Sequence, residues 1–249
     1  MPVHDWTRVD RSLFHDFYPS WVSGLSCRLN GGVLPSAYYA LCENLRDGYQ
    51  PKFLELPEPT RDYKDAGRPG EGRFLFDSPP RTWLQAECVW PEYAEKVISI
   101  RRCSDHAVVS AIRIVTEDGK RRPQRFAAFV NWATEVIRDG ISLLIVDPFP
   151  TDPCGTRDIA KALWNEFVQE DFVLPANKRL TLLAFSSRGE NTIYVEPIAV
   201  GDVLPDMPLF LKPEFYVPAP LEATYQATWD VFPAALKHLF EPPANKNMP

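Results

Sequence analysis

The chain has 249 residues, and its 33 acidic and 27 basic residues give a net charge of −6. Its 25 prolines are about 10% of the chain, roughly twice the usual share. Glycine is near average and aromatic residues make up 12%, so the composition predicts a folded protein with stiff connections and excludes a disordered chain. The negative total argues against general affinity for nucleic acid, although a local basic patch is compatible with it.

No stretch of the chain is apolar enough to cross a membrane, since the longest apolar run, 141–146, is far below the roughly 18–20 residues required. The first twenty residues carry several charges and no apolar signal segment. We therefore expect a cytoplasmic protein without a membrane partner. The five cysteines form no CxxC pair, which indicates reduced thiols and excludes a zinc ribbon.

In the first third of the chain, apolar residues recur every three or four positions over 12–29. This periodicity predicts a helix, with Pro19 at a first turn or a kink. A second helix is predicted over 35–45 and a strand over 50–56. The polar, proline-bearing segment 57–72 is the best candidate for a mobile loop.

The middle of the chain is rich in strand signals. Two Val- and Ile-rich segments, 95–102 and 107–116, predict a hairpin. An amphipathic helix is predicted over 123–139, ended by Gly140. The apolar run 141–146 predicts a strand that is buried on both faces and central in its sheet.

The last third predicts a helix over 156–170 and a second hairpin from 179–186 and 191–198. The proline-rich segment 204–220 predicts an extended arm lying on the body of the protein. A final helix with a proline kink is predicted over 221–239.

These elements predict an α/β (α+β) fold with a mixed central sheet and flanking helices. The sequence has no internal repeat and no long flexible linker, so we expect a single domain over 1–249. Its core would comprise about 34–200, and the arm and last helix 201–240.

Short motifs along nearly the whole chain carry a family resemblance. Examples are Val3-His4-Asp5-Trp6, Phe14-His15-Asp16-Phe17, Leu29-Asn30-Gly31-Gly32, Tyr38-Tyr39-Ala40-Leu41 and Leu221-Glu222-Ala223-Thr224-Tyr225. Together they resemble the DUF4058 family, a domain of unknown function. That family in turn resembles the Uma-type proteins of the PD-(D/E)xK superfamily, which implies a restriction-endonuclease-like core: helices, a strand, a strand hairpin, a helix and a buried strand.

The resemblance also implies where a metal site would lie. In such nucleases an Asp on one strand and a Glu on the next bind a divalent metal, and a nearby Lys acts on the phosphate or the water. This chain has Lys52 and Arg113 in place of the two acids, with Lys120 following. The resemblance therefore implies a degenerate site without a metal and without a cofactor.

Other carboxylates leave an alternative open. Glu55 and Glu117 with Lys120 define a shifted Mg²⁺ site, and Asp147 follows the buried strand, where open α/β sheets bind ligands. Each is also compatible with a structural role: the two glutamates as solvated charges at strand ends, and Asp147 as a cap before Pro148.

Basic residues gather in one part of the sequence. The phosphate-binding candidates are Arg101, Lys120, Arg121, Arg122 and Arg125, with Arg102 and Arg113 nearby. Arginine forks fit phosphate oxygens, and the helix beginning near Pro123 adds its N-terminal dipole. The other interpretation is a solvated turn.

The remaining chemistry-bearing residues favour structural roles. His4-Asp5 and His15-Asp16 look like metal-ligand pairs, but with four histidines in the chain we predict no metal site. The tryptophans are expected in the core. Cys154, ahead of a predicted helix, is a weak nucleophile candidate, and no GxSxG, P-loop, GxGxxG or HExxH motif occurs.

Three hypotheses follow. The leading one is an inactive endonuclease-like domain that acts as a binding or scaffold module. The first alternative is a metal-dependent nuclease acting on DNA or RNA with migrated ligands. The second is a homo-oligomeric interaction protein whose arm at 204–220 embraces a second copy of the chain.

Overall fold

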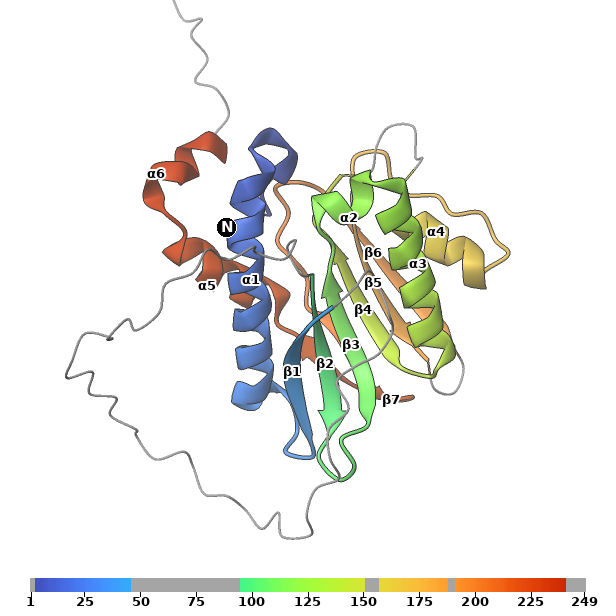
Figure 1. The fold of residues 1–249 in the computed structure, drawn as a ribbon. Helices are drawn as coiled ribbons and strands as arrows, with labels where there is room; N and C mark the ends of the chain where they lie inside the picture. Colours follow the sequence, from blue (N-terminus) through green and yellow to red (C-terminus); the bar gives the residue numbers. More distant parts are fainter. Residues whose placement is uncertain (1–2, 46–94, 151–156, 188–190, 241–249) are drawn as a thin grey trace, which may run out of the picture.

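A computed structural model describes residues 3–45, 95–150, 157–187 and 191–240, and its main feature is a six-stranded mixed sheet (Figure 1). The strands lie in the order of the chain. They are β1 (Tyr38–Asn44), β2 (Lys96–Arg102), β3 (Val108–Ile114), β4 (Ser142–Asp147), β5 (Leu180–Ser186) and β6 (Thr192–Ile198). The mixed α/β class predicted from the sequence is confirmed.

The sheet combines antiparallel meanders with one parallel pair. β1, β2 and β3 pair antiparallel, β3 and β4 pair parallel, and β5 and β6 continue antiparallel from β4. Both predicted hairpins are confirmed, and so is the central buried strand, because every residue of β4 is buried. The parallel pair requires a crossover connection, which α3 (Pro123–Arg138) provides.

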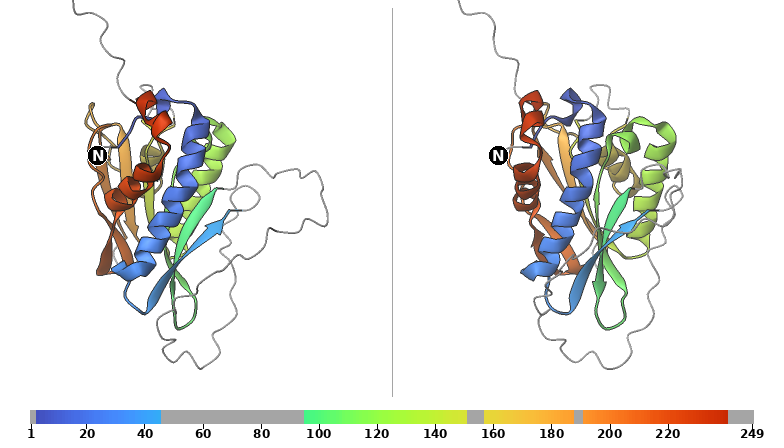
Figure 2. Two further views of the ribbon diagram at one scale, coloured as in Figure 1. Left: turned by 90° about the vertical axis from the view of Figure 1, so that its left-hand side faces the viewer. Right: turned by 60° about the vertical axis from the view of Figure 1, so that its left-hand side comes forward.

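Helices cover both faces of the sheet, giving three layers (Figures 1 and 2). α3 and α4 (Ile159–Phe167) lie on one face, and their apolar sides form a core with residues of β3, β4 and β5. α1 (Arg11–Arg28) and α5 (Leu221–Val231) lie together on the other face. Their larger core includes an aromatic cluster of Trp6, Phe14, Phe17, Trp21 and Trp229.

Local signals set the limits of α1 and α3. The side chain of Asp10 caps α1 by accepting a hydrogen bond from the amide of Ser12 at 2.8 Å. Pro19 lies inside the helix, which continues through a short π-helical turn, η2 (Leu29–Val33), to Gly32 at φ 128°. Gly140, at φ 75°, ends α3 as predicted.

The predicted helix over 35–45 is wrong, because this segment forms β1. The side chain of Asn30 holds the strand in place: its Oδ1 accepts from the amide of Ala40 at 2.7 Å, and its Nδ2 donates to the carbonyl of Ala40 at 2.9 Å. Every residue of β1 pairs with β2. Pairing with a strand more than fifty residues later in the chain therefore overrides the local pattern.

The segment 204–220 is extended and lies on the body of the protein, as predicted, but it does not form a single arm. Its residues pair with one another as a hairpin, β7 (Met207–Lys212) and β8 (Phe215–Ala219), in which Pro208 lies opposite Pro218. Leu209 and Leu211 are buried against the α1 face of the main sheet. The segment that was expected to embrace a second copy is thus packed on its own chain.

The remaining helices differ from the predictions in length. α4 is shorter at both ends than the predicted helix over 156–170. The last predicted helix is interrupted at Phe232 and Pro233, in agreement with the predicted kink. It continues as α6 (Ala234–Lys237) and the 3₁₀ turn η3 (His238–Phe240). Two further short elements are the 3₁₀ turn η1 (Trp6–Arg8) and the helix α2 (Glu117–Arg121).

Two sequence predictions, the strand over 50–56 and the loop over 57–72, lie outside the described residues. Four tryptophans are fully buried, which confirms the prediction of core packing for Trp6, Trp21, Trp132 and Trp229. In the part of the chain that the structure describes, no helix combines the length and apolar character needed to span a membrane.

Candidate functional site at the carboxyl ends of β3 and β4

Because β3 and β4 are parallel, their carboxyl ends meet at one edge of the sheet, which is where open α/β sheets bind ligands. The residues that follow β3 are Val115, Thr116 and helix α2. β4 ends at Asp147. Four sequence-predicted site residues, Arg113, Glu117, Lys120 and Asp147, therefore belong to this edge.

Arg113 lies in the interior of the protein. Its side chain has no exposed surface, and Nη2 donates to Oε2 of Glu95 in a close ion pair. Oε1 of the same carboxylate accepts from the hydroxyl of Thr116 at 2.8 Å. Toward α3, the guanidinium carbon of Arg113 lies 4.4 Å from the ring centre of Phe129 and 4.6 Å from that of Trp132. Arg113 is thus held by one carboxylate and two aromatic rings.

Lys120 and Asp147 form a second buried pair. The ammonium of Lys120 donates to Oδ2 of Asp147 and to the carbonyl of Phe149, both at 2.7 Å. Oδ1 of Asp147 accepts from the amide of Phe149 at 3.1 Å. Burial raises the pKa of Asp147 above its usual value, although the ammonium of Lys120 opposes the shift. These contacts fasten α2 to the end of β4.

The two acids of α2 also face cations. Glu117 accepts from Nε of Arg121 at 2.9 Å, and Asp118 accepts from Arg11 at 3.1 Å. Glu95, Glu117, Asp118 and Asp147 are therefore each matched by a basic side chain. Within the described ranges, no three His, Cys, Asp or Glu side chains come together in an arrangement that could hold a metal ion.

A third buried pair lies on the same sheet face, farther along β2. Nη2 of Arg101 donates to Oε1 of Glu43 on β1 at 3.0 Å, and Nη1 donates to the carbonyl of His106 at 3.0 Å. The same Glu43 oxygen accepts from the hydroxyl of Ser99 in a short hydrogen bond. Because the side chain of Arg101 is only 4% exposed, it does not reach the protein surface.

The predicted basic cluster is therefore divided. Arg101, Arg113 and Lys120 are buried in ion pairs, whereas Arg121 and Arg122 are exposed and Arg125 is half-buried at the start of α3. Arg157 approaches this group and donates to the carbonyl of Arg121. Arg102 lies elsewhere, in an exposed pair with Asp105.

The remaining candidates do not join this site. Lys52, Glu55 and Cys154 lie outside the described residues. His4 stacks on Trp229 at 3.7 Å, whereas His15 lies 3.7 Å from Asp118. The two predicted His-Asp pairs therefore take part in separate contacts.

Sequence reasoning missed Glu43 and Glu95, the acids that neutralise the buried arginines. The sequence did contain a signal for Glu95. This residue stands at the start of the first strand of the predicted hairpin, and the alternation of side chains along a strand places it on the same face as Arg113. The partner of Arg101 could not be found in this way, since β1 was predicted as a helix.

Comparisons of this chain with protein-family models, curated proteins and solved structures gave no match. The resemblance to the DUF4058 family and to PD-(D/E)xK proteins therefore stays a prediction from the sequence.

Proposed function

We propose that this chain is a non-catalytic binding module built on an endonuclease-like core, and that it does not cleave phosphodiester bonds. The observation that carries the proposal is the buried guanidinium of Arg113 beside the carboxylate of Glu95. The sequence resemblance implies a metal-binding glutamate where Arg113 stands. In place of a metal ion, the protein uses its own cation to neutralise the neighbouring carboxylate.

The order of the elements supports the endonuclease-like core. Helix α1 precedes the antiparallel strands β1, β2 and β3, and α3 then leads to β4, which is parallel to β3. This succession agrees with the core order that the resemblance implies. A fold by itself does not imply an activity, so the function depends on the site residues.

Electrostatics argue against a divalent ion at this place. A divalent cation about 4 Å from the guanidinium would be repelled by roughly 8 kcal/mol at an effective dielectric constant of 20. The negative charge of Glu95 is already matched by the guanidinium of Arg113, and its other oxygen accepts from Thr116, so little of its attraction is left for a divalent ion. Asp147, the next acid, is held by Lys120.

A cleavage assay tests the proposal. Purified protein is incubated with single- and double-stranded DNA and RNA in Mg²⁺ or Mn²⁺, with and without chelator. We expect no cleavage above the level of a mock purification, and no saturable binding of Mn²⁺ by calorimetry.

The alternative, a nuclease with migrated ligands, gives the opposite result. Chelator-sensitive cleavage that copurifies with the protein and is lost in Glu95→Gln or Glu117→Gln would overturn the proposal. An Asp105→Asn variant serves as the control, because Asp105 is exposed in the hairpin turn, where it pairs with Arg102 and accepts from the amide of Ala107.

The surface group formed by Arg121, Arg122 and Arg125 favours a polyanion as the bound partner. The side chain of Arg121 is 72% exposed despite its pair with Glu117. The three residues adjoin the N-terminus of α3, whose Ncap residue supplies no side-chain hydrogen bond. Exposed arginines near a helix N-terminus attract phosphate groups through both charge and dipole.

Fluorescence anisotropy with a labelled duplex tests this candidate. Reversal of all three arginines to Glu should weaken binding and lower the salt slope by about three, whereas reversal of the exposed Arg28, Lys161 and Lys212 should change it little. Equal effects of the two triple variants would leave only non-specific attraction and would contradict this partner.

A further inference from the structure

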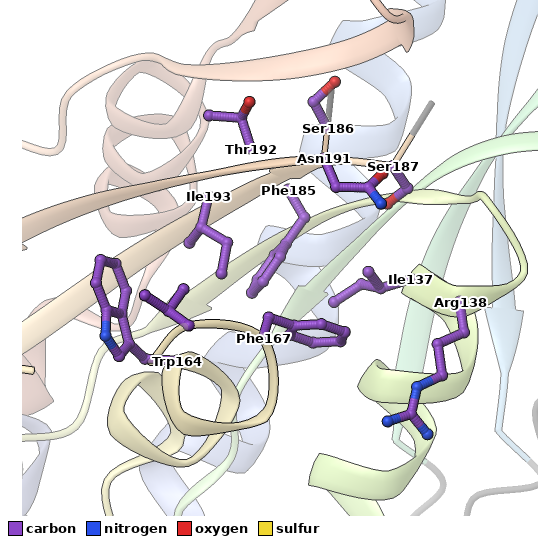
Figure 3. A pocket seen from close by; sticks show the side chains of 11 residues that line it. Ile137, Arg138, Trp164, Phe167, Phe185, Ser186, Ser187, Asn191, Thr192 and Ile193 are labelled. Carbon is purple, nitrogen blue, oxygen red and sulfur yellow. The ribbon is translucent and has the colours of Figure 1, made fainter. Parts of the chain in front are cut away.

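A pocket of about 510 Å³ lies apart from the three buried ion pairs, between the C-terminal ends of α3 and α4, the end of β5 and the start of β6 (Figure 3). Its volume falls within the range of small-molecule sites, roughly 300–1,000 Å³. The pocket has no part in the proposed function, so a test of one proposal does not affect the other.

The inner surface of the pocket is apolar and largely aromatic. Phe167 of α4 meets Phe185 of β5 edge to face, with ring centres 6.1 Å apart, and Ile193 of β6 points toward them (Figure 3). Phe167 is 37% exposed, although Phe185 beneath it is buried. Ile137, Trp164 and Val168 complete the apolar wall. A flat apolar ligand would cover the surface that Phe167 leaves in water.

One side of the pocket carries neutral polar groups from Ser187 and Asn191. Ser186 and Thr192 pair with each other across the strands, and their hydroxyls point away from the rings (Figure 3); the hydroxyl of Ser186 donates to the carbonyl of Pro213 at 3.5 Å. Ser187 is fixed in position, because its hydroxyl donates to the carbonyl of Ile141 at 2.9 Å and its amide donates to Oγ of Ser142 at 3.4 Å. These contacts hold the end of β5 against the start of β4. The position of Ser187 at the polar side of the pocket is therefore set before any ligand arrives.

Among the described lining residues one is charged, Arg138, and it does not favour a charged ligand. Its side chain is 64% exposed and lies 3.7 Å from Glu166, so its charge is both hydrated and opposed. Figure 3 shows the guanidinium directed away from the rings of Phe167 and Phe185. Among the residues that the structure describes, no charged group faces the apolar floor, and a charged ligand there would lose hydration without gaining an ion pair from them.

From this combination we infer a binding site for an uncharged planar aromatic molecule of one or two rings that carries an amide or similar hydrogen-bonding group on one edge. The ring packs on Phe167, and the polar edge lies along Ser187 and Asn191. The neutral polar edge and the aromatic floor together favour an uncharged aromatic ligand over a charged one.

Three probes of similar size but different charge test the inference: benzamide, benzoate and benzylamine. Binding is followed by the indole N–H resonance of Trp164, which donates to the carbonyl of Glu170 at 2.7 Å and is assigned by its loss in Trp164→Phe. We expect saturable shifts with benzamide at a Kd of about 1–10 mM, as for other fragments, and at least fivefold weaker binding of both charged probes.

Variants locate the binding. Phe167→Ala should weaken benzamide binding at least fivefold, and Ile193→Phe, which fills the pocket, should do the same. Phe215→Ala is the matched control, since Phe215 is a similarly exposed ring on β8, and it should bind like the unchanged protein. The inference is overturned by the absence of a saturable shift at about 20 mM benzamide, by equal binding of a charged probe, or by unchanged binding in both pocket variants.

Discussion

Arg113 and Arg101 are basic side chains whose surroundings, and not their charge, determine what they can do. Both belong to strands, and strand alternation turns them toward the sheet face that carries α3. A buried guanidinium must be paired, because an isolated charge in the interior costs several kcal/mol. Glu43 and Glu95 provide the pairs, so these arginines contribute to the structure of the protein and are unavailable to an external phosphate.

Replacement of Arg113 by Met should destabilise the protein by about 3–5 kcal/mol, because Glu95 would be left without its cation in a largely buried position. The double variant with Glu95→Gln should lose about 1–3 kcal/mol less than the sum of the single variants. Urea unfolding followed by circular dichroism measures these losses. As a control, Arg102→Met breaks an exposed ion pair and should change the stability little. If the losses of the Arg113 and Glu95 variants were strictly additive, the proposed coupling between these two residues would be contradicted.

Asp147→Asn should lower the free energy of unfolding by a similar amount, about 3–5 kcal/mol, because it leaves the buried ammonium of Lys120 without a counter-charge. The combination Lys120→Met with Asp147→Leu should recover most of that loss, since no uncompensated charge remains. Thermal unfolding gives the comparison. A double variant that is less stable than Asp147→Asn would show that the pair itself, and not the compensation of its charges, stabilises the edge.

At the scale of elements, helix ends follow local chemistry, whereas β1 and the β7–β8 hairpin follow long-range packing. Gly140 illustrates the first case. It ends α3 at φ 75°, a conformation that side chains disfavour. The space around it is ordinary, because a Cβ at this position would lie 3.8 Å from the carbonyl oxygen of Ser187. Gly24 has the opposite setting, since it lies inside α1 and a Cβ there would meet Oγ1 of Thr228 at 3.8 Å.

The two glycines therefore predict opposite effects of one substitution. Gly140→Ala should destabilise the protein by about 1 kcal/mol, because of backbone strain alone. Gly24→Ala should stabilise it by about 0.5–1 kcal/mol, because alanine favours the helix and restricts the unfolded chain. Denaturant midpoints of the two variants check the signs, and a loss of stability in both would indicate that the α1–α5 contact is too tight for a methyl group.

At the scale of the whole molecule, the N-terminal segment is joined to the C-terminal helices. Val3 exchanges backbone hydrogen bonds with Asp202 and Gly201, and the ring of His4 lies on Trp229 of α5 at 3.7 Å. Nδ1 of His4 is 2.8 Å from the hydroxyl of Tyr225. Burial, aided by the positive charge of Lys237, lowers the pKa of His4 to about 4.

This contact predicts a pH dependence of stability. The folded protein favours neutral His4, whereas the unfolded chain takes up the proton near the ordinary pKa of 6.5. The stabilisation is therefore complete above pH 6.5 and declines as the pH falls toward 4. The stability advantage over His4→Gln should narrow across that interval, measured by urea unfolding at each pH. His238→Gln, at an exposed histidine, is the control, and a constant advantage would contradict the prediction.

The sequence by itself determined the elements whose signals are local: the helices α1 and α3, the two hairpins of the main sheet and the buried strand β4. Their periodicity, caps and apolar runs act within a few residues. Tertiary structure decided β1 and the fate of the proline-rich segment, because strand pairing and burial far along the chain outweigh local preference. It also decided the candidate site. The acids that hold Arg101, Arg113 and Lys120 lie 58, 18 and 27 residues away in sequence, and only the folded sheet brings each cation to its carboxylate and away from solvent.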